Sequence, residues 1–223
     1  LYAEYITEQN CAGKGGTLIF GDSNMDFWGA WESQTGLTKY VNGYNVGIGG
    51  STTSDWLHAY DRLVKPFAPE RMILNIGYND INVWGDNGED FTKNLKTLFE
   101  TIHADFPETE IYYIFINPSP SVYANGAYTN WKVEDAINRA KALVAELDYV
   151  TGVDIFDLMT TEDGNNPVAE YYVSDNIHLS AAGYQVLGDH LRQVIFGQEQ
   201  VGGYHFGDVE CYVTTSGIDL SKD

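Results

Sequence analysis

The sequence predicts a three-layer α/β/α sandwich built on a mostly parallel five-stranded sheet. Short apolar runs alternate with amphipathic helical patterns along the chain, and loops rich in Gly, Asn and Asp directly follow several of the apolar runs. This alternation favours parallel strands, because parallel neighbours need crossover connections and those connections are commonly helices. Ligand sites in such sheets lie at the carboxyl ends of the strands.

Each predicted element has its own local signal. The predicted strands are short buried runs at residues 17–21, 44–46, 71–76, 111–116 and 153–156. The predicted helices carry apolar residues on one side and cover residues 56–64, 91–102, 131–147 and 181–196. Cap-type residues from Thr52 to Asp55 precede the first of these helices.

The chain is expected to form one domain over residues 1–223. Its 223 residues, 43% of them hydrophobic, suffice for one sizeable core, and no repeat, low-complexity tract or linker divides them. The core is expected at about residues 17–196, with 197–223 as an extension that packs back on it. The formal net charge of -20 would repel phosphate backbones and anionic lipid, so neither nucleic acid nor a membrane is an expected partner.

The two cysteines, Cys11 and Cys211, lie near opposite ends of the chain. A disulfide between them would fasten both termini to one face of the domain, but two unrelated thiols are equally compatible with the sequence. The acidic composition, abundant Tyr and few Lys favour a secreted protein, although Leu1 is not followed by the basic segment and apolar run of a signal peptide.

Ser23 directly follows the first predicted strand, where a tight turn into a helix can expose its hydroxyl. A serine becomes a strong nucleophile when a positioned base removes its proton, and the base needs a third group to fix its tautomer. Asp175 lies three residues before His178, close enough for its carboxylate to accept from one ring nitrogen while the other faces Ser23. Taken alone, Ser23 could be an ordinary N-cap and His178 a surface residue.

Acyl transfer also requires hydrogen-bond donors aimed at the developing oxyanion. The sequence offers the backbone N–H of Ser23, a backbone N–H within residues 47–50 and the side-chain amide of Asn79. The glycines could instead shape a turn, and Asn79 could cap its own loop.

Taken together, four motifs resemble the SGNH hydrolases, also called the GDSL esterase family. They are GDS at residues 21–23, NVGIGG at 45–50, GYND at 77–80 and DNIH at 175–178. The resemblance covers about residues 17–196 and implies a flavodoxin-like fold and serine esterase chemistry that needs no cofactor.

The resemblance also implies roles for individual residues. Ser23 would be the nucleophile, and His178 with Asp175 would complete the triad. Gly50 and Asn79 would complete the oxyanion hole begun by the Ser23 N–H, with Gly47 as an alternative donor to Gly50. Two positions depart from the family pattern: Asn24 replaces the leucine of the family name, and Ser51 stands where many members have aspartate.

The loops at the expected active rim carry many aromatic side chains: Phe27, Trp28, Trp31, Trp84, Tyr123, Tyr128 and Trp131. About half of these rings should fill the core, because tryptophan is highly buried on average. Aromatic rings also stack on sugar faces, and we expect Trp28, Trp84 and Trp131 to contact substrate. The loops lack a long aliphatic run and are rich in Gly, Asn, Ser and Thr, which favours a short acyl group such as acetyl on a carbohydrate, in a small-molecule or oligosaccharide ester.

Three alternatives remain open at this point. A lysophospholipase or thioesterase would use the same residues. A metal-dependent phosphoesterase could use Asp22, Asp26 and the Asn79-Asp80 pair, but such centres need several histidines and residues 1–20 contain neither Asp nor His. A non-catalytic carbohydrate-binding domain could keep the scaffold. The acidic loops at 86–90 and 162–166 do not follow the spacing of a calcium loop, so no metal is expected.

Overall fold

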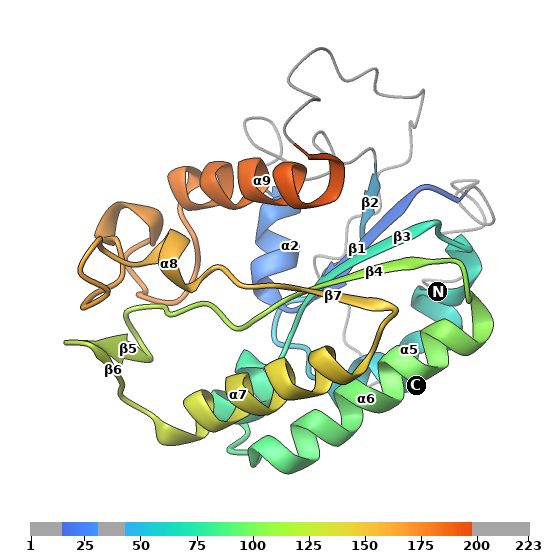
Figure 1. The fold of residues 1–223 in the computed structure, drawn as a ribbon, viewed down its shortest axis with the longest axis horizontal. Coiled ribbons are helices and arrows are strands. Elements are labelled where there is room, and N and C mark those ends of the chain that lie inside the picture. Colours follow the sequence, from blue (N-terminus) through green and yellow to red (C-terminus); the bar gives the residue numbers. More distant parts are fainter. Residues whose placement is uncertain (1–14, 31–42, 198–223) are drawn as a thin grey trace.

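The central sheet has five strands, all paired in parallel, in the order β2-β1-β3-β4-β7. The structure is a computed structural model and describes residues 15–30 and 43–197 (Figure 1). The strands are β1 (Thr17–Gly21), β2 (Gly43–Asn45), β3 (Arg71–Asn75), β4 (Glu110–Ile114) and β7 (Val150–Val153). The predicted parallel five-stranded sheet is confirmed.

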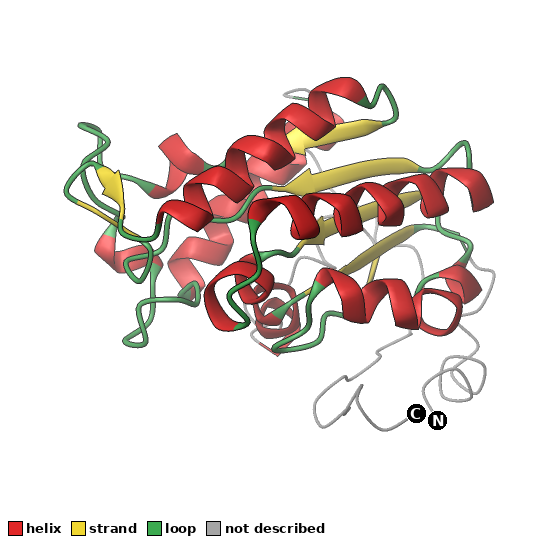
Figure 2. Ribbon diagram, turned by 90° about the horizontal axis from the view of Figure 1, so that it is seen from below, coloured by secondary structure: helices red, strands yellow, loops and turns green. Residues whose placement is uncertain are grey.

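Helices cover both faces of this sheet (Figures 1 and 2). They are α2 (Ser23–Ala30), α5 (Thr53–Leu63), α6 (Gly88–Asp105), α7 (Trp131–Glu146), α8 (Phe156–Met159) and α9 (Ala181–Phe196). Alternation along β1 places Leu18 and Phe20 in the core shared with α5, α6 and α7, and Ile19 in the core shared with α2, α8 and α9. The three-layer arrangement is therefore confirmed. No helix in the described ranges has both the length and the apolar character required to cross a membrane.

Polar caps set the starts of the long helices. Thr52 and Asp55 form a reciprocal capping box at α5, as the cap-type residues at 52–55 predicted. Asn87 caps α6, Asn130 caps α7 and Ser180 caps α9. Each side-chain oxygen satisfies a backbone N–H that has no partner inside its helix.

The carboxyl ends of four strands are aligned. Gly21 pairs with Asn75, Asn75 with Ile114, and Ile114 with Val153. In the sheet, β2 lies on one side of β1 and β3 lies on the other side. This reversal is a topological switch point, where open α/β sheets bind ligands. Ser23 begins the helix that follows β1, and Asn79 begins the helical turn that follows β3, so both emerge at this point.

The predicted fifth strand at 153–156 is wrong by three residues. The strand that pairs with β4 is Val150–Val153, whose two central residues are exposed and give little apolar signal. Beyond it the Asp154 carboxylate accepts the Phe156 N–H at 3.1 Å and turns the chain into α8.

Several short elements had no counterpart among the sequence predictions, and three of them flank the site. They are the hairpin of β5 (Tyr123–Ala124) and β6 (Ala127–Tyr128) and a π-helical turn at Asn79–Val83. Cys11, Cys211, Trp31 and the tail beyond Gly197 lie outside the described residues, so the disulfide and the packing of the tail stay predictions.

Candidate active site

Ser23 is the first residue of α2, directly beyond the end of β1. The turn that precedes it requires glycine, because Gly21 has a φ of +143° and a Cβ there would lie 2.0 Å from the carbonyl oxygen of Asn75. The Asp22 N–H donates to the same oxygen at 3.1 Å. The turn is thus fixed against β3, and Ser23 has a defined position at the sheet edge.

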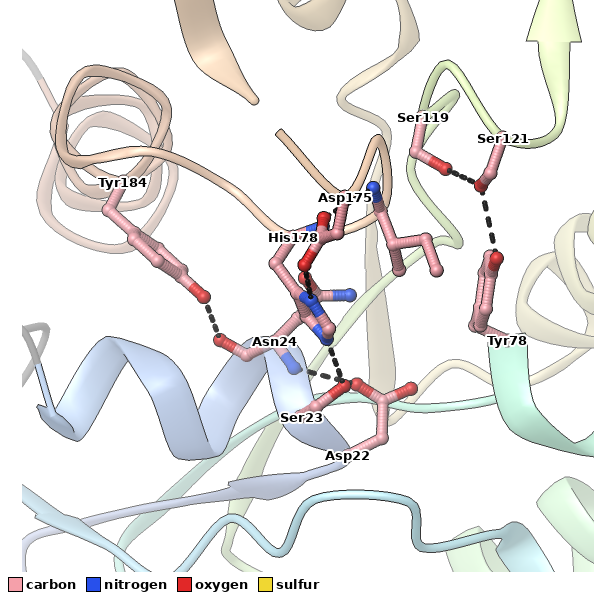
Figure 3. Close-up of polar contacts among 10 residues, drawn as sticks. Asp22, Ser23, Asn24, Tyr78, Ser119, Ser121, Asp175, His178 and Tyr184 are labelled. Atoms are coloured by element: carbon pink, nitrogen blue, oxygen red, sulfur yellow. Dashed lines mark hydrogen bonds and ion pairs between the residues drawn. The ribbon is translucent and has the colours of Figure 1, made fainter. Parts of the chain in front are cut away.

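Ser23, His178 and Asp175 form one hydrogen-bonded chain (Figure 3). The Ser23 Oγ lies 2.8 Å from the His178 Nε2, and the His178 Nδ1 lies 2.6 Å from the Asp175 Oδ2. The fold brings Ser23 and His178 together from 155 positions apart in the sequence, and Asp175 lies three residues before His178. This is the geometry that a serine nucleophile, its base and an orienting carboxylate require.

The loop from Asp175 to His178 holds the imidazole in place. The Asp175 Oδ1 accepts the backbone N–H groups of Ile177 and His178 at 2.9 and 3.0 Å, and Asn176 adopts a positive φ of 64° that closes the turn. Burial alone would raise the pKa of the Asp175 carboxyl, but the hydrogen bonds from the His178 side chain and from the two backbone N–H groups outweigh it, and the pKa lies below its usual value. An ionised Asp175 keeps the proton on Nδ1, which leaves Nε2 free to accept from Ser23.

Three further hydrogen-bond donors follow the carboxyl ends of β3, β2 and β1. The Asn79 Nδ2 donates one N–H to the Ser51 carbonyl oxygen at 3.0 Å, and its second N–H is available to a ligand. Gly50 adopts a φ of +79°, no atom lies within 4 Å of where its Cβ would be, and its N–H has no acceptor among the described residues. The first helical N–H of α2, on Ser23, has no partner inside its helix.

The other glycines of the 47–50 loop have different tasks. The Gly47 N–H donates to the Asn45 Oδ1 at 2.9 Å, and a Cβ on Gly47 would lie 2.5 Å from the Asp26 nitrogen. The Gly49 N–H donates to the Asp26 Oδ2 at 3.0 Å. Gly47 therefore seats the loop against α2, and Gly50 is the better candidate donor.

Asp22, which precedes Ser23, is almost completely buried, with 1% of its surface exposed. Its Oδ1 accepts the Asn24 N–H at 3.0 Å, while its Oδ2 has no hydrogen-bond partner in the part of the chain that the structure describes. Burial raises the pKa of this carboxyl to about 7; the Asn24 N–H opposes the rise and the nearby charge of Asp80 adds to it.

Two sets of contacts lie on either side of the Ser23–His178–Asp175 chain and support it (Figure 3). The sequence patterns did not indicate either set. The Tyr184 hydroxyl of α9 donates to the Asn24 carbonyl oxygen at 2.8 Å, which ties α9 to the start of α2. On the other side, the Tyr78 and Ser121 hydroxyls lie 3.0 Å apart, and the Ser121 N–H donates to the Asn176 carbonyl oxygen at 2.9 Å. A buried tyrosine hydroxyl needs a partner, but its sequence does not identify which one.

The aromatic residues divide into core and surface. The prediction that Trp28 contacts substrate is wrong: its side chain is 0% exposed and stacks on Tyr184 with ring centroids 5.2 Å apart. Trp84 and Trp131 are 72% and 68% exposed. Their segments are joined, because the Asn130 amide donates to the Asn82 Oδ1 at 3.2 Å and the Lys132 Nζ donates to the Gly85 carbonyl oxygen at 2.9 Å.

The carboxylates that a phosphoesterase centre would need are engaged with the chain itself. Asp22 accepts from Asn24, Asp26 accepts from Gly49, and Asp80 accepts from the backbone and side chain of Thr53. In the described ranges, no group of three or more His, Cys, Asp or Glu side chains is placed to hold a metal ion.

A parallel α/β/α sandwich with a Ser–His–Asp chain at its switch point defines a serine hydrolase of the SGNH type. The chain belongs to the GDSL-like lipase/acylhydrolase family, a sequence model of which matches residues 13–186, and it is an ester-hydrolysing enzyme.

Known relatives agree with this membership. The human isoamyl acetate-hydrolyzing esterase 1 homolog is 27% identical in a 207-residue alignment that covers 80% of this chain and 80% of the relative. A solved structure from Streptococcus pneumonia superposes with a TM-score of 0.69 at 27% identity, covering 86% of this chain and 92% of the other. An acetyl-xylooligosaccharide esterase from Geobacillus Stearmophilus, solved as a mutant, shares the fold with a TM-score of 0.65 at 17% identity, covering 87% and 100%.

Proposed function

We propose that this esterase removes short acyl groups, acetyl above all, from carbohydrate through an acyl-enzyme on Ser23. The observation that carries the proposal is the continuous hydrogen-bonded chain from the Ser23 Oγ through His178 to Asp175. A hydroxyl 2.8 Å from an unprotonated imidazole nitrogen can lose its proton as it attacks a carbonyl carbon.

The proposed reaction has two steps, acylation of Ser23 and hydrolysis of the acyl-enzyme. Ser23 attacks the ester carbonyl, His178 takes the proton, and the oxyanion is held by the N–H groups of Ser23 and Gly50 and the amide of Asn79. The tetrahedral intermediate collapses, His178 returns the proton to the leaving alkoxide, and the acyl group stays on Ser23. Water, activated by His178, then releases the acid. Asp175 stabilises the imidazolium in both steps.

Asn79→Ala tests the oxyanion assignment. We expect kcat on p-nitrophenyl acetate to fall about 10²-fold, since one side-chain donor to an oxyanion contributes on that order, while KM changes little. Asn138→Ala makes the same change at an exposed position of α7, so it is the matched control and should retain most of kcat. A fall confined to KM would mean that Asn79 binds substrate without stabilising the oxyanion.

The acyl and alcohol parts of the substrate are proposed from the surroundings of the site. The human relative is named for an acetate ester, and the Geobacillus relative for an acetylated oligosaccharide. Trp84 is the residue after the π-helical turn that begins at Asn79, and its N–H donates to the Asn79 carbonyl oxygen at 3.0 Å. The exposed indoles of Trp84 and Trp131, carried by segments joined through the Asn82–Asn130 hydrogen bond, offer flat surfaces for sugar rings.

Trp84→Ala and Trp131→Ala should therefore distinguish substrates. We expect kcat/KM on an acetylated oligosaccharide to fall about fivefold more than kcat/KM on p-nitrophenyl acetate, because a stacking contact contributes about 1 kcal/mol. Val194→Ala removes an exposed apolar side chain from α9 and serves as the control. Equal losses on both substrates would point to a role of the indoles in the site itself, and no loss on either would remove them from the proposal.

A lysophospholipase or thioesterase is the second candidate. Such an enzyme needs an aliphatic surface for a long acyl chain, whereas the large apolar side chains exposed in the described ranges are Phe27, Val83, Trp84, Trp131 and Val194, three of which are aromatic. Comparing kcat/KM for acetyl, butyryl, octanoyl and palmitoyl esters decides between the candidates, and a rise with chain length would favour the second.

A further inference from the structure

Ser51 is a buried serine in which the side chain and both backbone polar groups are hydrogen-bonded. Its Oγ donates to the Gly21 carbonyl oxygen at 3.1 Å and accepts the Trp56 Nε1–H at 2.9 Å. Its carbonyl oxygen accepts from the Asn79 Nδ2 at 3.0 Å, and its N–H donates to the Ile48 carbonyl oxygen at 3.2 Å. Its side chain approaches neither His178 nor Asp175 within hydrogen-bonding distance, so Ser51 is outside the proton-transfer chain.

These bonds connect Ser51 to all three proposed oxyanion donors. Ser51 follows Gly50 directly, binds the Asn79 amide, and holds the carbonyl of Gly21 two residues before Ser23. We propose that Ser51 is a positioning residue that sets the relative placement of the three donors, an inference that rests on the proposed esterase function. The donors come from separate segments of the chain, and among the residues that the structure describes only Ser51 is bonded or adjacent to each of these segments.

The chemistry requires such a fixed point. An oxyanion donor contributes fully only when it lies about 2.7–3.1 Å from the oxyanion, and donors that are fixed beforehand need no rearrangement during the reaction. A backbone N–H in a glycine-rich loop is held by no side chain of its own, and Gly50 has no atom within 4 Å of its Cβ position to restrain it. The Ser51 hydroxyl supplies this restraint from the next residue.

The fold itself does not depend on Ser51 alone. Thr53 donates through its N–H and its hydroxyl to the buried Asp80 carboxylate, which joins the same two segments one step further from Ser23. These contacts involve no atom of Ser51. Removing the Ser51 hydroxyl should therefore relax the donors while the sheet and α5 remain in place.

Ser51→Ala is the direct test, with p-nitrophenyl acetate as substrate and an alkyl trifluoromethyl ketone as the probe that forms a tetrahedral adduct on Ser23. We expect kcat to fall about tenfold, which is about 1.4 kcal/mol, and the inhibition constant of the ketone to rise by the same factor. KM and the pH dependence of kcat/KM should not move, because His178 and Asp175 keep their contacts. Ser51→Thr, which keeps the hydroxyl, should recover most of kcat.

Two further variants control the test. Ser54→Ala makes the same change at an exposed position of α5 and should leave kcat and the ketone affinity at their wild-type values. Trp56→Phe removes the indole N–H that fixes the Ser51 Oγ and keeps a smaller aromatic ring in its place, so kcat and ketone affinity should fall together by about two- to fivefold. Trp56→Phe keeps the inference testable even if Ser51→Ala does not fold.

The outcomes separate this inference from the proposed function. A folded Ser51→Ala with unchanged kcat, or with a lower kcat and unchanged ketone affinity, would overturn the positioning role while wild type and Ser23→Ala behave as proposed. If the wild type does not bind the ketone, or Ser23→Ala keeps its turnover, the esterase assignment to Ser23 fails and the role of Ser51 fails with it. If Ser51→Ala loses kcat and ketone affinity by the same factor, and Ser51→Thr recovers both, the positioning role of Ser51 would be established.

Discussion

Replacing Ser23 with alanine is expected to lower kcat on p-nitrophenyl acetate by at least about 10³-fold, because the variant has no nucleophile to form an acyl-enzyme. The lost hydroxyl is the group that lies 2.8 Å from the His178 Nε2, so the proton-transfer step is lost as well. Oxyanion donors and substrate binding remain and account for residual turnover. The measurement is steady-state hydrolysis by purified protein, with thermal unfolding recorded to show that the variant is folded.

Companion variants test whether the three residues act as one unit. His178→Ala should cost nearly as much as Ser23→Ala, and the double variant should be no worse than either, since each change already disables the same step. Asp175→Asn should cost less, because the base remains and only its orientation and charge support are lost. Ser174→Ala, an exposed serine of the same loop as Asp175, is the matched control. A folded Ser23→Ala variant with wild-type turnover would end the nucleophile assignment.

The proximity of Ser23, His178 and Asp175 could be predicted from the sequence, because each of the motifs that contain them lies at a strand end or in a short loop. Ser23 follows a fully buried strand, and parallel pairing brings the ends of neighbouring strands to one edge. The order of apolar runs and helical patterns thus placed Ser23 and Asn79 on the same rim. The three-residue spacing from Asp175 to His178 predicted their contact locally, in a turn where Asn176 takes the positive φ.

The two wrong predictions, for Trp28 and for the last strand of the sheet, have a common physical cause. Trp28 follows Ser23 in the sequence and was expected at the substrate, but the direction of α2 turns it toward Tyr184 on α9, 156 residues away. The end of β7 was misplaced because its exposed central residues lack the apolar signal of a buried strand. Which face a residue occupies depends on packing partners that are distant in the sequence, and no local pattern encodes them.

The surroundings of Ser51 and Asp22 also could not be predicted from the sequence. In the sequence, Ser51 is notable only as a departure from the family pattern, yet its hydroxyl is bonded to Gly21 and Trp56 in the buried part of the site. Asp22 reads as part of a motif, and its burial is visible only in three dimensions. Sequence reasoning can therefore locate the reacting groups, while the residues that hold them become apparent from their contacts.

Asp22→Asn is expected to change the pH dependence of stability. Burial raises the pKa of the Asp22 carboxyl from 3.8 to about 7 in the folded protein. Between these values the folded state holds a proton that the unfolded state has released, so the folded state loses stability as the pH rises from about 4 to about 7, and the loss levels off above 7. The slope is about 1.4 kcal/mol per pH unit for one proton, which gives an upper limit on the order of 4 kcal/mol.

Asparagine has nearly the same shape and carries no charge at any of these pH values. It keeps an oxygen for the Asn24 N–H, and its amide nitrogen replaces the Oδ2 that has no partner within the described residues, a cost that does not vary with pH. The free energy of unfolding of the variant, measured in urea from pH 4 to pH 8, should therefore rise relative to wild type by up to about 4 kcal/mol across this range, whatever the offset at pH 4. Asp157→Asn, at an exposed position of α8, controls for the loss of one negative charge from a chain of net charge -20. If the stability curves of wild type and Asp22→Asn run parallel from pH 4 to pH 8, Asp22 does not hold a proton at neutral pH, and its carboxylate must be stabilised in the folded protein.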